Sequence, residues 1–246
     1  MYGILKKKYG QNFLIDKNII KKISDLIPNK FLKIIEIGPG DGRLTEKILE
    51  FEPKEFKIIE IDSDLIPLIK TRFDNKSNIK IINENILNYP LIEKVDLIIS
   101  NLPYNISSQI LVKICLMNYL PSNLILMFQK EFAERLMDIK LNSLNSLVNC
   151  FYEIKTDFNV SKNCFRPIPK IDSKVLLFQK KKIPLLKKKE INNFIDFKRR
   201  LFSFKRKTLS NLLRNYNIDK NRFDLSIRVE DLYLQSLIDI FREINP

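Results

Sequence analysis

Histidine is missing from the sequence, and its absence excludes several kinds of chemistry. Without an imidazole, the chain cannot build a Ser-His-Asp triad, a histidine general base or a histidine metal site. Cys115, Cys150 and Cys164 are far apart and form no CxxC pair, so we expect buried apolar side chains there, with no disulfide and no metal. These absences predict chemistry that depends on a reactive cofactor and on positioning.

Long apolar runs are also missing. No stretch approaches the roughly 20 apolar residues of a membrane helix, and the first residues, MYGILKKKYGQNF, lack the apolar segment of a secretory signal. We therefore expect a cytoplasmic protein with no membrane partner. A length of 246 residues allows one large core with a small appendage.

Acidic residues are too few to balance the basic ones, and the formal net charge is +14. Between Lys180 and Arg214 there are thirteen Lys or Arg residues against only Glu190 and Asp196. Solubility or an AT-rich genome, which would also fit the single alanine, Ala133, can produce a basic composition. Clustering of the charge nevertheless favours a nucleic-acid partner, because basic side chains gain affinity by releasing counterions from phosphates.

Short apolar runs alternate with helix-like spacing over most of the chain. The strand-like runs are residues 33–37, 57–61, 79–82, 95–100 and 124–128, and the helix-like ones are 44–51, 65–73, 107–118 and 131–139. This order predicts an α/β fold, a Rossmann-like doubly wound and mostly parallel sheet with ligands beyond the carboxyl ends of its strands. From about Ile183 the pattern is helical, so we expect domains at 1–183 and 184–246, the second small, basic and all-helical.

Glycine is scarce, yet three of the five glycines fall in the stretch EIGPGDG, at positions 38, 40 and 42. Such clustering indicates positive φ angles or close approach of a ligand to the backbone. Because the stretch follows a predicted strand and opens a predicted helix, it can hold a nucleotide-like cofactor; the alternative is a tight turn alone. The spacing is GxGxG and not GxGxxG, so no pyrophosphate is implied.

Two polar residues follow the next strands. Glu60 ends the second strand, where a carboxylate can accept from both hydroxyls of a ribose, and Asn85 follows the third, where an amide can face an adenine ring. The alternative for Glu60 is an exposed acid at a strand end. With EIGPGDG, the two residues predict an adenosine-type ligand, and no GxxxxGK[ST] triphosphate site is present.

The stretch SNLPYNIS, residues 100–107, follows the fourth strand. There Asn101 and the backbone of Leu102 can offer two acceptors to an amino group, and Tyr104 can stack on a base. Such a site suits methylation of an exocyclic amine, because the acceptors free the nitrogen lone pair and no strong base is needed. An isolated N-x-P-Y would indicate only a turn; its place beside the glycine loop favours the functional interpretation.

These stretches together resemble a known family, the ribosomal RNA adenine N6,N6-dimethyltransferases, which include the kasugamycin-resistance methyltransferase. The matching segments, in family order, are YGQNFLIDKNII at 9–20, EIGPGDGRLT at 36–45, IEID at 59–62, NLPYNIS at 101–107, FRPIPKIDSKV at 165–175 and KRKTLSNLL at 205–213. The resemblance implies S-adenosylmethionine as the cofactor, bound by Asn12, Leu14, Gly38, Glu60, Asn85 and Asn101. At position 85 the chain departs from the family, which usually has Asp, and this puts the strength of that contact in doubt.

The resemblance also implies roles in catalysis and RNA binding. Asn101 and the Leu102 carbonyl would hold the target N6, with Tyr104 stacking on the base and Phe165 on its second face. We assign phosphate contacts to the basic carboxy-terminal residues Lys198, Arg199, Arg200, Lys205, Arg206 and Lys207. A solvated helical face is the alternative for these.

The expected function is dimethylation of two adjacent adenosines in a hairpin loop of small-subunit rRNA, within a pre-ribosomal small subunit, by a monomer. Two alternatives stay open. One is an adenine methyltransferase for large-subunit rRNA or DNA; the other is a ribosome-assembly or nucleic-acid-binding factor that keeps the fold without catalysis. An intact Asn101-to-Tyr104 motif argues against the second.

Overall fold

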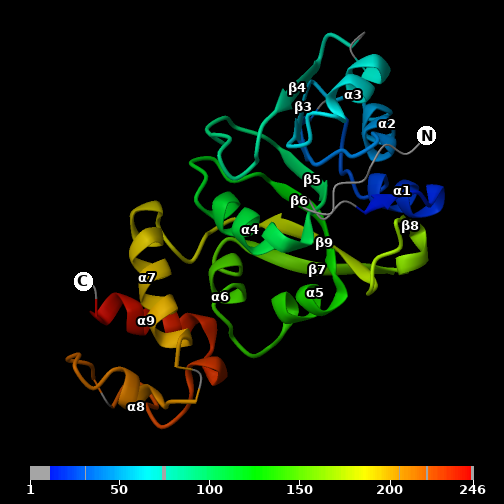
Figure 1. The fold of residues 1–246 in the computed structure, drawn as a ribbon. Coiled ribbons are helices and arrows are strands. Elements are labelled where there is room, and N and C mark those ends of the chain that lie inside the picture. The colour runs from blue at the N-terminus through cyan, green and yellow to red at the C-terminus, as the bar shows by residue number, and fades with distance from the viewer. Residues whose placement is uncertain (1–11, 31, 74–75, 205, 220, 245–246) are drawn as a thin grey trace. The chain divides into compact units, whose positions relative to one another are not determined.

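The computed structural model describes residues 12–30, 32–73, 76–204, 206–219 and 221–244 (Figure 1). Its main feature is a seven-stranded sheet with the strand order β4-β3-β2-β5-β6-β9-β7. The strands are β2 (Lys33–Ile37), β3 (Glu55–Glu60), β4 (Ile79–Asn83), β5 (Leu97–Asn101), β6 (Asn123–Gln129), β7 (Tyr152–Val160) and β9 (Ser173–Lys180). The five strands from β2 to β6 run parallel to one another, and β9 runs antiparallel to β6. The predicted mostly parallel α/β sheet is therefore confirmed.

A second, two-stranded sheet joins β1 (Phe13–Leu14) to β8 (Phe165–Arg166) in antiparallel register. The helices are α1 (Lys17–Ser24), α2 (Arg43–Leu49), α3 (Ile66–Phe73), α4 (Ser107–Cys115), α5 (Lys130–Met137), α6 (Asn145–Val148), α7 (Ile191–Phe202), α8 (Leu209–Leu212) and α9 (Leu234–Ile244). None of the helices in the described part of the chain has the length and apolarity that crossing a lipid bilayer requires.

The central strands are buried on both faces, which is why their sequences are almost continuous apolar runs. In β2, Ile34 and Ile35 are 2% and 0% exposed, and in β5, Ile98 and Ile99 are both 0% exposed, although consecutive strand positions point to opposite faces. The order of the strands creates a switch point. The chain runs outward from β2 through β3 to β4 and then returns to β5 on the other side of β2, so the loops after β2 and β5 diverge and leave room for a ligand.

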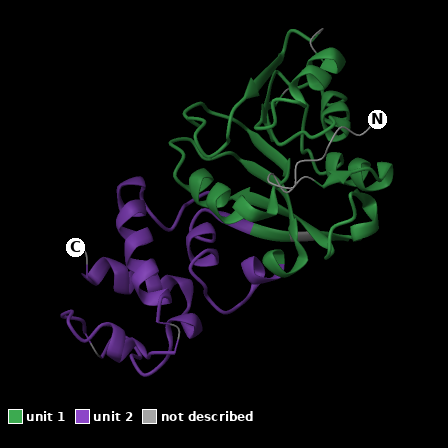
Figure 2. Cartoon of the chain, in the orientation of Figure 1, with its two compact units in different colours: residues 1–133, 154–180 green, residues 134–153, 181–246 purple. Residues whose placement is uncertain are grey.

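The chain divides into two compact units (Figure 2). Residues 1–133 and 154–180 form unit 1, and residues 134–153 and 181–246 form unit 2. The expected domain boundary at residue 183 would place residues 134–153 in the first domain. These residues instead make hydrogen bonds within unit 2. The Leu141 N–H donates to the Glu230 carbonyl at 2.8 Å, and the Leu185 N–H donates to the Cys150 carbonyl at 2.9 Å. Bonds of this kind join segments far apart in sequence, so periodicity does not reveal them.

Candidate active site

A cleft opens in unit 1 at the carboxyl ends of β2, β3 and β5, where the strand order places the switch point. All six residues expected to bind the cofactor line this cleft, and so do all three expected catalytic residues, with Asn101 belonging to both sets. They are Asn12, Leu14, Gly38, Glu60, Asn85 and Asn101, with Leu102 and Tyr104. Segments separated by almost ninety positions therefore meet at one place.

The glycine loop between β2 and α2 has positive φ at all three glycines: 65° at Gly38, 60° at Gly40 and 82° at Gly42. The three glycines differ in the space available for a Cβ atom. A Cβ on Gly40 would lie 2.8 Å from Cδ1 of Phe13, and a Cβ on Gly42 would lie 2.7 Å from the Phe73 ring. A Cβ on Gly38 would meet nothing within 4 Å, because this glycine faces the cleft. The backbone at Gly38 is therefore open to close approach by a ligand.

Glu60 ends β3 and is 4% exposed. The backbone N–H of Asp62 donates to its Oε1 at 2.8 Å. Burial raises the pKa of Glu60, while hydrogen bonds from backbone N–H groups, including that of Gly40, lower it. A pair of ribose hydroxyls donating to this carboxylate would favour its charged form further.

Asn85 lies in the loop after β4, and its side chain is held by the backbone of Leu87. Its Oδ1 accepts the N–H of Leu87 at 3.0 Å, and the Leu87 carbonyl in turn accepts from Nζ of Lys113 at 2.7 Å. The backbone N–H and the carbonyl of Leu87 are thus both hydrogen-bonded to side chains. Because an N–H must face an oxygen, this bond also determines which side of the amide is Nδ2.

Asn101 ends β5 and reaches the amino-terminal segment. Its Nδ2 donates to the backbone carbonyl of Asn12 at 3.0 Å, which leaves Oδ1 as the acceptor of the amide. The neighbouring Ser100 hydroxyl donates to the Ile37 carbonyl at 2.5 Å and ties the end of β5 to the end of β2. Asn12 was expected as a cofactor contact; its carbonyl also orients Asn101, a role that sequence reasoning missed.

Tyr104 lines the cleft with its hydroxyl anchored. Its Oη lies 2.7 Å from Oγ of Ser173, the first residue of β9. Burial raises the pKa of Tyr104, and the hydrogen bond with Ser173 lowers it. The ring is therefore held at its far end as a neutral phenol. Ser173 was not among the predicted site residues, although it lies in the FRPIPKIDSKV segment.

Phe165 is not at the cleft, which corrects the expected second stacking face. It is 0% exposed, belongs to the hydrophobic core and pairs with Leu14 across the β1–β8 ladder. A ring with no exposed surface has no face to offer a base. A single aromatic residue in a motif could not be distinguished from a core residue by sequence alone.

Glu36 is a cleft residue that sequence reasoning missed as a functional candidate. It is 1% exposed and accepts the Thr45 hydroxyl at 2.6 Å. Burial, the largest cause, raises the pKa of Glu36 to about 8, so its side chain is protonated at neutral pH. The sequence feature that could have identified Glu36 is its place as the acidic residue at the start of EIGPGDG.

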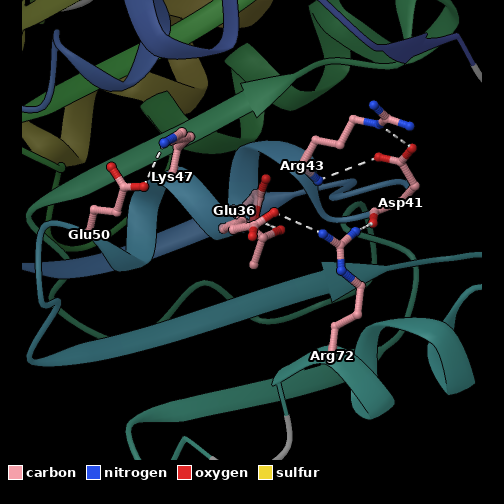
Figure 3. A network of polar contacts seen from close by, with 8 residues as sticks. Glu36, Asp41, Arg43, Lys47, Glu50 and Arg72 are labelled. Atoms are coloured by element: carbon pink, nitrogen blue, oxygen red, sulfur yellow. Dashed lines mark hydrogen bonds and ion pairs between the residues drawn. The ribbon is translucent and has the colours of Figure 1, made fainter. Parts of the chain in front are cut away.

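Charged residues around the glycine loop form a network that braces it (Figure 3). Nε of Arg43 donates to Oδ2 of Asp41 at 2.7 Å, and Arg72 donates to the Asp41 carbonyl and, at 2.9 Å, to Glu46. The loop and α2 are thus joined to α3. Within the described part of the chain, no cluster of acidic and cysteine side chains is placed to hold a metal ion.

The predicted RNA contacts in unit 2 separate into two groups. Lys198 is 5% exposed, and its Nζ donates to the Ser143 carbonyl at 2.5 Å and to the Ser143 Oγ at 3.0 Å. Its ammonium is used inside the unit, which corrects its assignment as a phosphate contact. Arg199, Arg200, Arg206 and Lys207 are exposed. Lys205 lies outside the described residues.

A Rossmann-like sheet with this cleft at its switch point defines a class of protein, the methyltransferases that use S-adenosylmethionine. The residues present fit that cofactor. Gly38 leaves open space, Glu60 offers a carboxylate at the next strand end, and Ile61 and Leu65 add apolar surface to the same cleft.

The chain belongs to the ribosomal RNA adenine dimethylase family, whose model matches residues 4–245. It is 40% identical over 263 residues to the ribosomal RNA small subunit methyltransferase A of Mycoplasma capricolum, covering 97% of each chain. A dimethyladenosine transferase from Plasmodium falciparum has a similar structure, with 26% identity, a TM-score of 0.83 and coverage of 95% of this chain and 97% of that one. The 23S rRNA methyltransferase ErmE shares the fold, with 22% identity, a TM-score of 0.74 and coverage of 96% and 100%.

Proposed function

We propose that the protein transfers methyl groups from S-adenosylmethionine to N6 of two adjacent adenosines in a hairpin loop of small-subunit rRNA. Family membership and the similarity to a small subunit methyltransferase A support this proposal. The observation that carries it is the orientation of Asn101, whose Nδ2 is bound to Asn12 and whose Oδ1 remains to accept from an amine beside the glycine loop.

The side chains here position the substrate and do not act as strong bases. The cofactor supplies an electrophilic methyl group on a sulfonium. Oδ1 of Asn101 and the carbonyl of Leu102 would accept the two N–H groups of the target amine in the first transfer and the one remaining N–H in the second, so that the nitrogen lone pair is available for in-line attack. As each bond from nitrogen to methyl forms, the bond from methyl to sulfur breaks, the cofactor leaves as a thioether and the nitrogen releases one proton. Tyr104 stacks on the flipped-out base, with its hydroxyl held by Ser173. This arrangement requires no histidine.

We assign methyl transfer to unit 1 and RNA binding to unit 2. The cleft with its glycine loop lies in unit 1, while the exposed cations Arg199, Arg200, Arg206 and Lys207 lie in unit 2. Contacts to phosphates position RNA without reading its sequence. The substrate we propose is rRNA within a pre-ribosomal small subunit, bound by a monomer.

The proposal is tested by transfer of labelled methyl groups to undermethylated small ribosomal subunits, with mono- and dimethyladenosine resolved. We expect dimethyladenosine from the wild type and a loss of about 100-fold or more in rate for Asn101→Ala, the usual cost of removing a preorganised hydrogen-bonding group. Asn118→Ala, at an exposed asparagine after α4 that is not part of the cleft lining, should keep full activity.

Two outcomes would contradict the proposal. If the wild type bound the subunits without transferring methyl groups, the protein would be an assembly factor. If Asn101→Ala retained full activity, the amine would be held elsewhere.

A further inference from the structure

A second hollow, of about 430 Å³, lies in unit 2 between the carboxyl-terminal ends of α7 and α8, and nothing in the methyl-transfer site uses it. Its size is within the range of small-ligand sites. The floor is apolar and consists of Phe197, Leu201 and Leu213, which are 7%, 4% and 2% exposed. The lining also includes Arg200, Phe204 and Tyr216.

The two aromatic residues of this lining are left open to solvent. Phe204 is 52% exposed and Tyr216 is 37% exposed, although both border a buried apolar floor. A phenylalanine that leaves about half of its surface in water buries little apolar area, so it contributes little to the stability of the fold. Exposed aromatic surface beside a hollow instead indicates a site for a ligand that has an apolar or π-electron face.

A basic side chain contacts each of these two aromatic residues. Nη1 of Arg200 donates to Oη of Tyr216 at 3.3 Å, and Nζ of Lys207 lies over the Phe204 ring, 4.9 Å from its centroid. The lining of the hollow contains no carboxylate, and the sequence from residue 197 to residue 214 contains no Asp or Glu. The charge therefore complements a polyanion and opposes an acidic protein surface.

Aromatic rings among cations match the chemistry of single-stranded nucleic acid, whose bases stack while its phosphates meet the positive charge. A regular duplex would use the cations alone, because its bases are stacked on one another and would leave Phe204 without a contact. The combination thus favours an unpaired nucleotide over a duplex backbone.

We propose that this hollow binds one unpaired base of the RNA substrate, with Phe204 as the stacking platform and Arg200 and Lys207 near the adjoining phosphates. The inference rests on the proposed function only in taking the RNA to be small-subunit rRNA. It gives unit 2 a contact with bases in addition to the phosphate contacts expected from its charge.

The test measures binding of the full chain, without cofactor, to a fluorescent single-stranded oligoribonucleotide and to a duplex of the same length, over a series of salt concentrations. Phe204→Ala should weaken binding of the single strand by roughly 10- to 100-fold and leave duplex binding unchanged. The slope of log K against log salt should stay the same, because no charge is removed. Phe204→Trp should restore binding.

Tyr233→Ala is the matched control, since Tyr233 is also in unit 2 and is 83% exposed but lies outside the hollow. It should change neither affinity. Arg206→Gln should weaken both RNAs and reduce the salt slope by roughly one ion. Equal losses on single strand and duplex for Phe204→Ala, or no loss on either, would overturn the proposal. If the wild type transferred no methyl groups but its binding of the single strand still depended on Phe204, the proposed function would be wrong and the proposed base-binding site would stand.

Discussion

At the scale of single residues, position 85 determines the polarity of the cleft where the adenine ring of the cofactor is expected. The Leu87 N–H requires an acceptor, so an oxygen of residue 85 must face it. With a carboxylate, a second oxygen would face the cleft as an acceptor. With Asn85, the remaining group is Nδ2, a donor that makes no hydrogen bond to another described residue.

We therefore expect Asn85→Asp to change which base the cofactor site prefers. The 6-amino group of S-adenosylhomocysteine donates and suits a carboxylate, whereas the 6-oxo group of S-inosylhomocysteine accepts and suits the amide. Asn85→Asp should bind the adenosyl compound about tenfold more tightly and the inosyl compound more weakly, as measured by calorimetry. Asn88→Asp, an exposed site in the same loop, controls for the added charge. An unchanged ratio of the two affinities would show that residue 85 does not face the 6-position.

At the scale of elements, the β2–α2 loop combines backbone conformation with packing. All three of its glycines have positive φ, but only Gly40 and Gly42 are pressed against aromatic rings, those of Phe13 and Phe73. Gly38 is free of such a neighbour. One loop thus serves two purposes, since it packs against β1 and α3 and exposes its backbone at the cleft.

This difference separates two alanine variants. Both should lose about 1–2 kcal/mol from the left-handed backbone, but Gly40→Ala should lose about 1–3 kcal/mol more, because its Cβ would overlap the Phe13 ring. Gly38→Ala should instead lose cofactor affinity out of proportion to stability, since its methyl group would project into the cleft. Chemical denaturation and cofactor titration on each variant measure both quantities. The explanation fails if the two variants are equally stable.

At the scale of the whole molecule, the stability of the folded chain depends on a carboxyl group held neutral in its core. Burial raises the pKa of Glu36 from 4.5 to about 8. Between these values the folded state keeps a proton that the unfolded state releases, so stability falls as pH rises through this window and the contribution of this group levels off above it. The slope cannot exceed about 1.4 kcal/mol per pH unit for one proton.

Glu36→Gln should remove that dependence, because an amide oxygen can still accept from Thr45 and never ionises. The difference in unfolding free energy between this variant and the wild type should be small at pH 4.5 and increase in favour of the variant up to about pH 8. Denaturant unfolding at a series of pH values gives the curve, and Glu131→Gln, at an exposed site, provides the control. A difference that does not vary with pH would mean that Glu36 titrates normally.

Local pattern was enough to predict strands β2 to β6, helices α2 to α5, the glycine loop and the polar residues at the strand ends, but it did not predict β1, α1 or β8. The reason is that strand ends of a parallel sheet meet at one edge, so Glu60, Asn85 and Asn101 had to come together once the sheet was predicted. The resemblance to a family added the cofactor and the amino-terminal contacts of Asn12 and Leu14.

Only the tertiary structure decided which side chains are buried and which are available. Phe165 and Lys198 have the residue types of a stacking platform and a phosphate contact, but the first is buried in the hydrophobic core and the second is bound to Ser143. Asn101 obtains its orientation from a carbonyl 89 residues away. Residue type is local, whereas burial and hydrogen-bond partners depend on segments that meet only after the chain has folded.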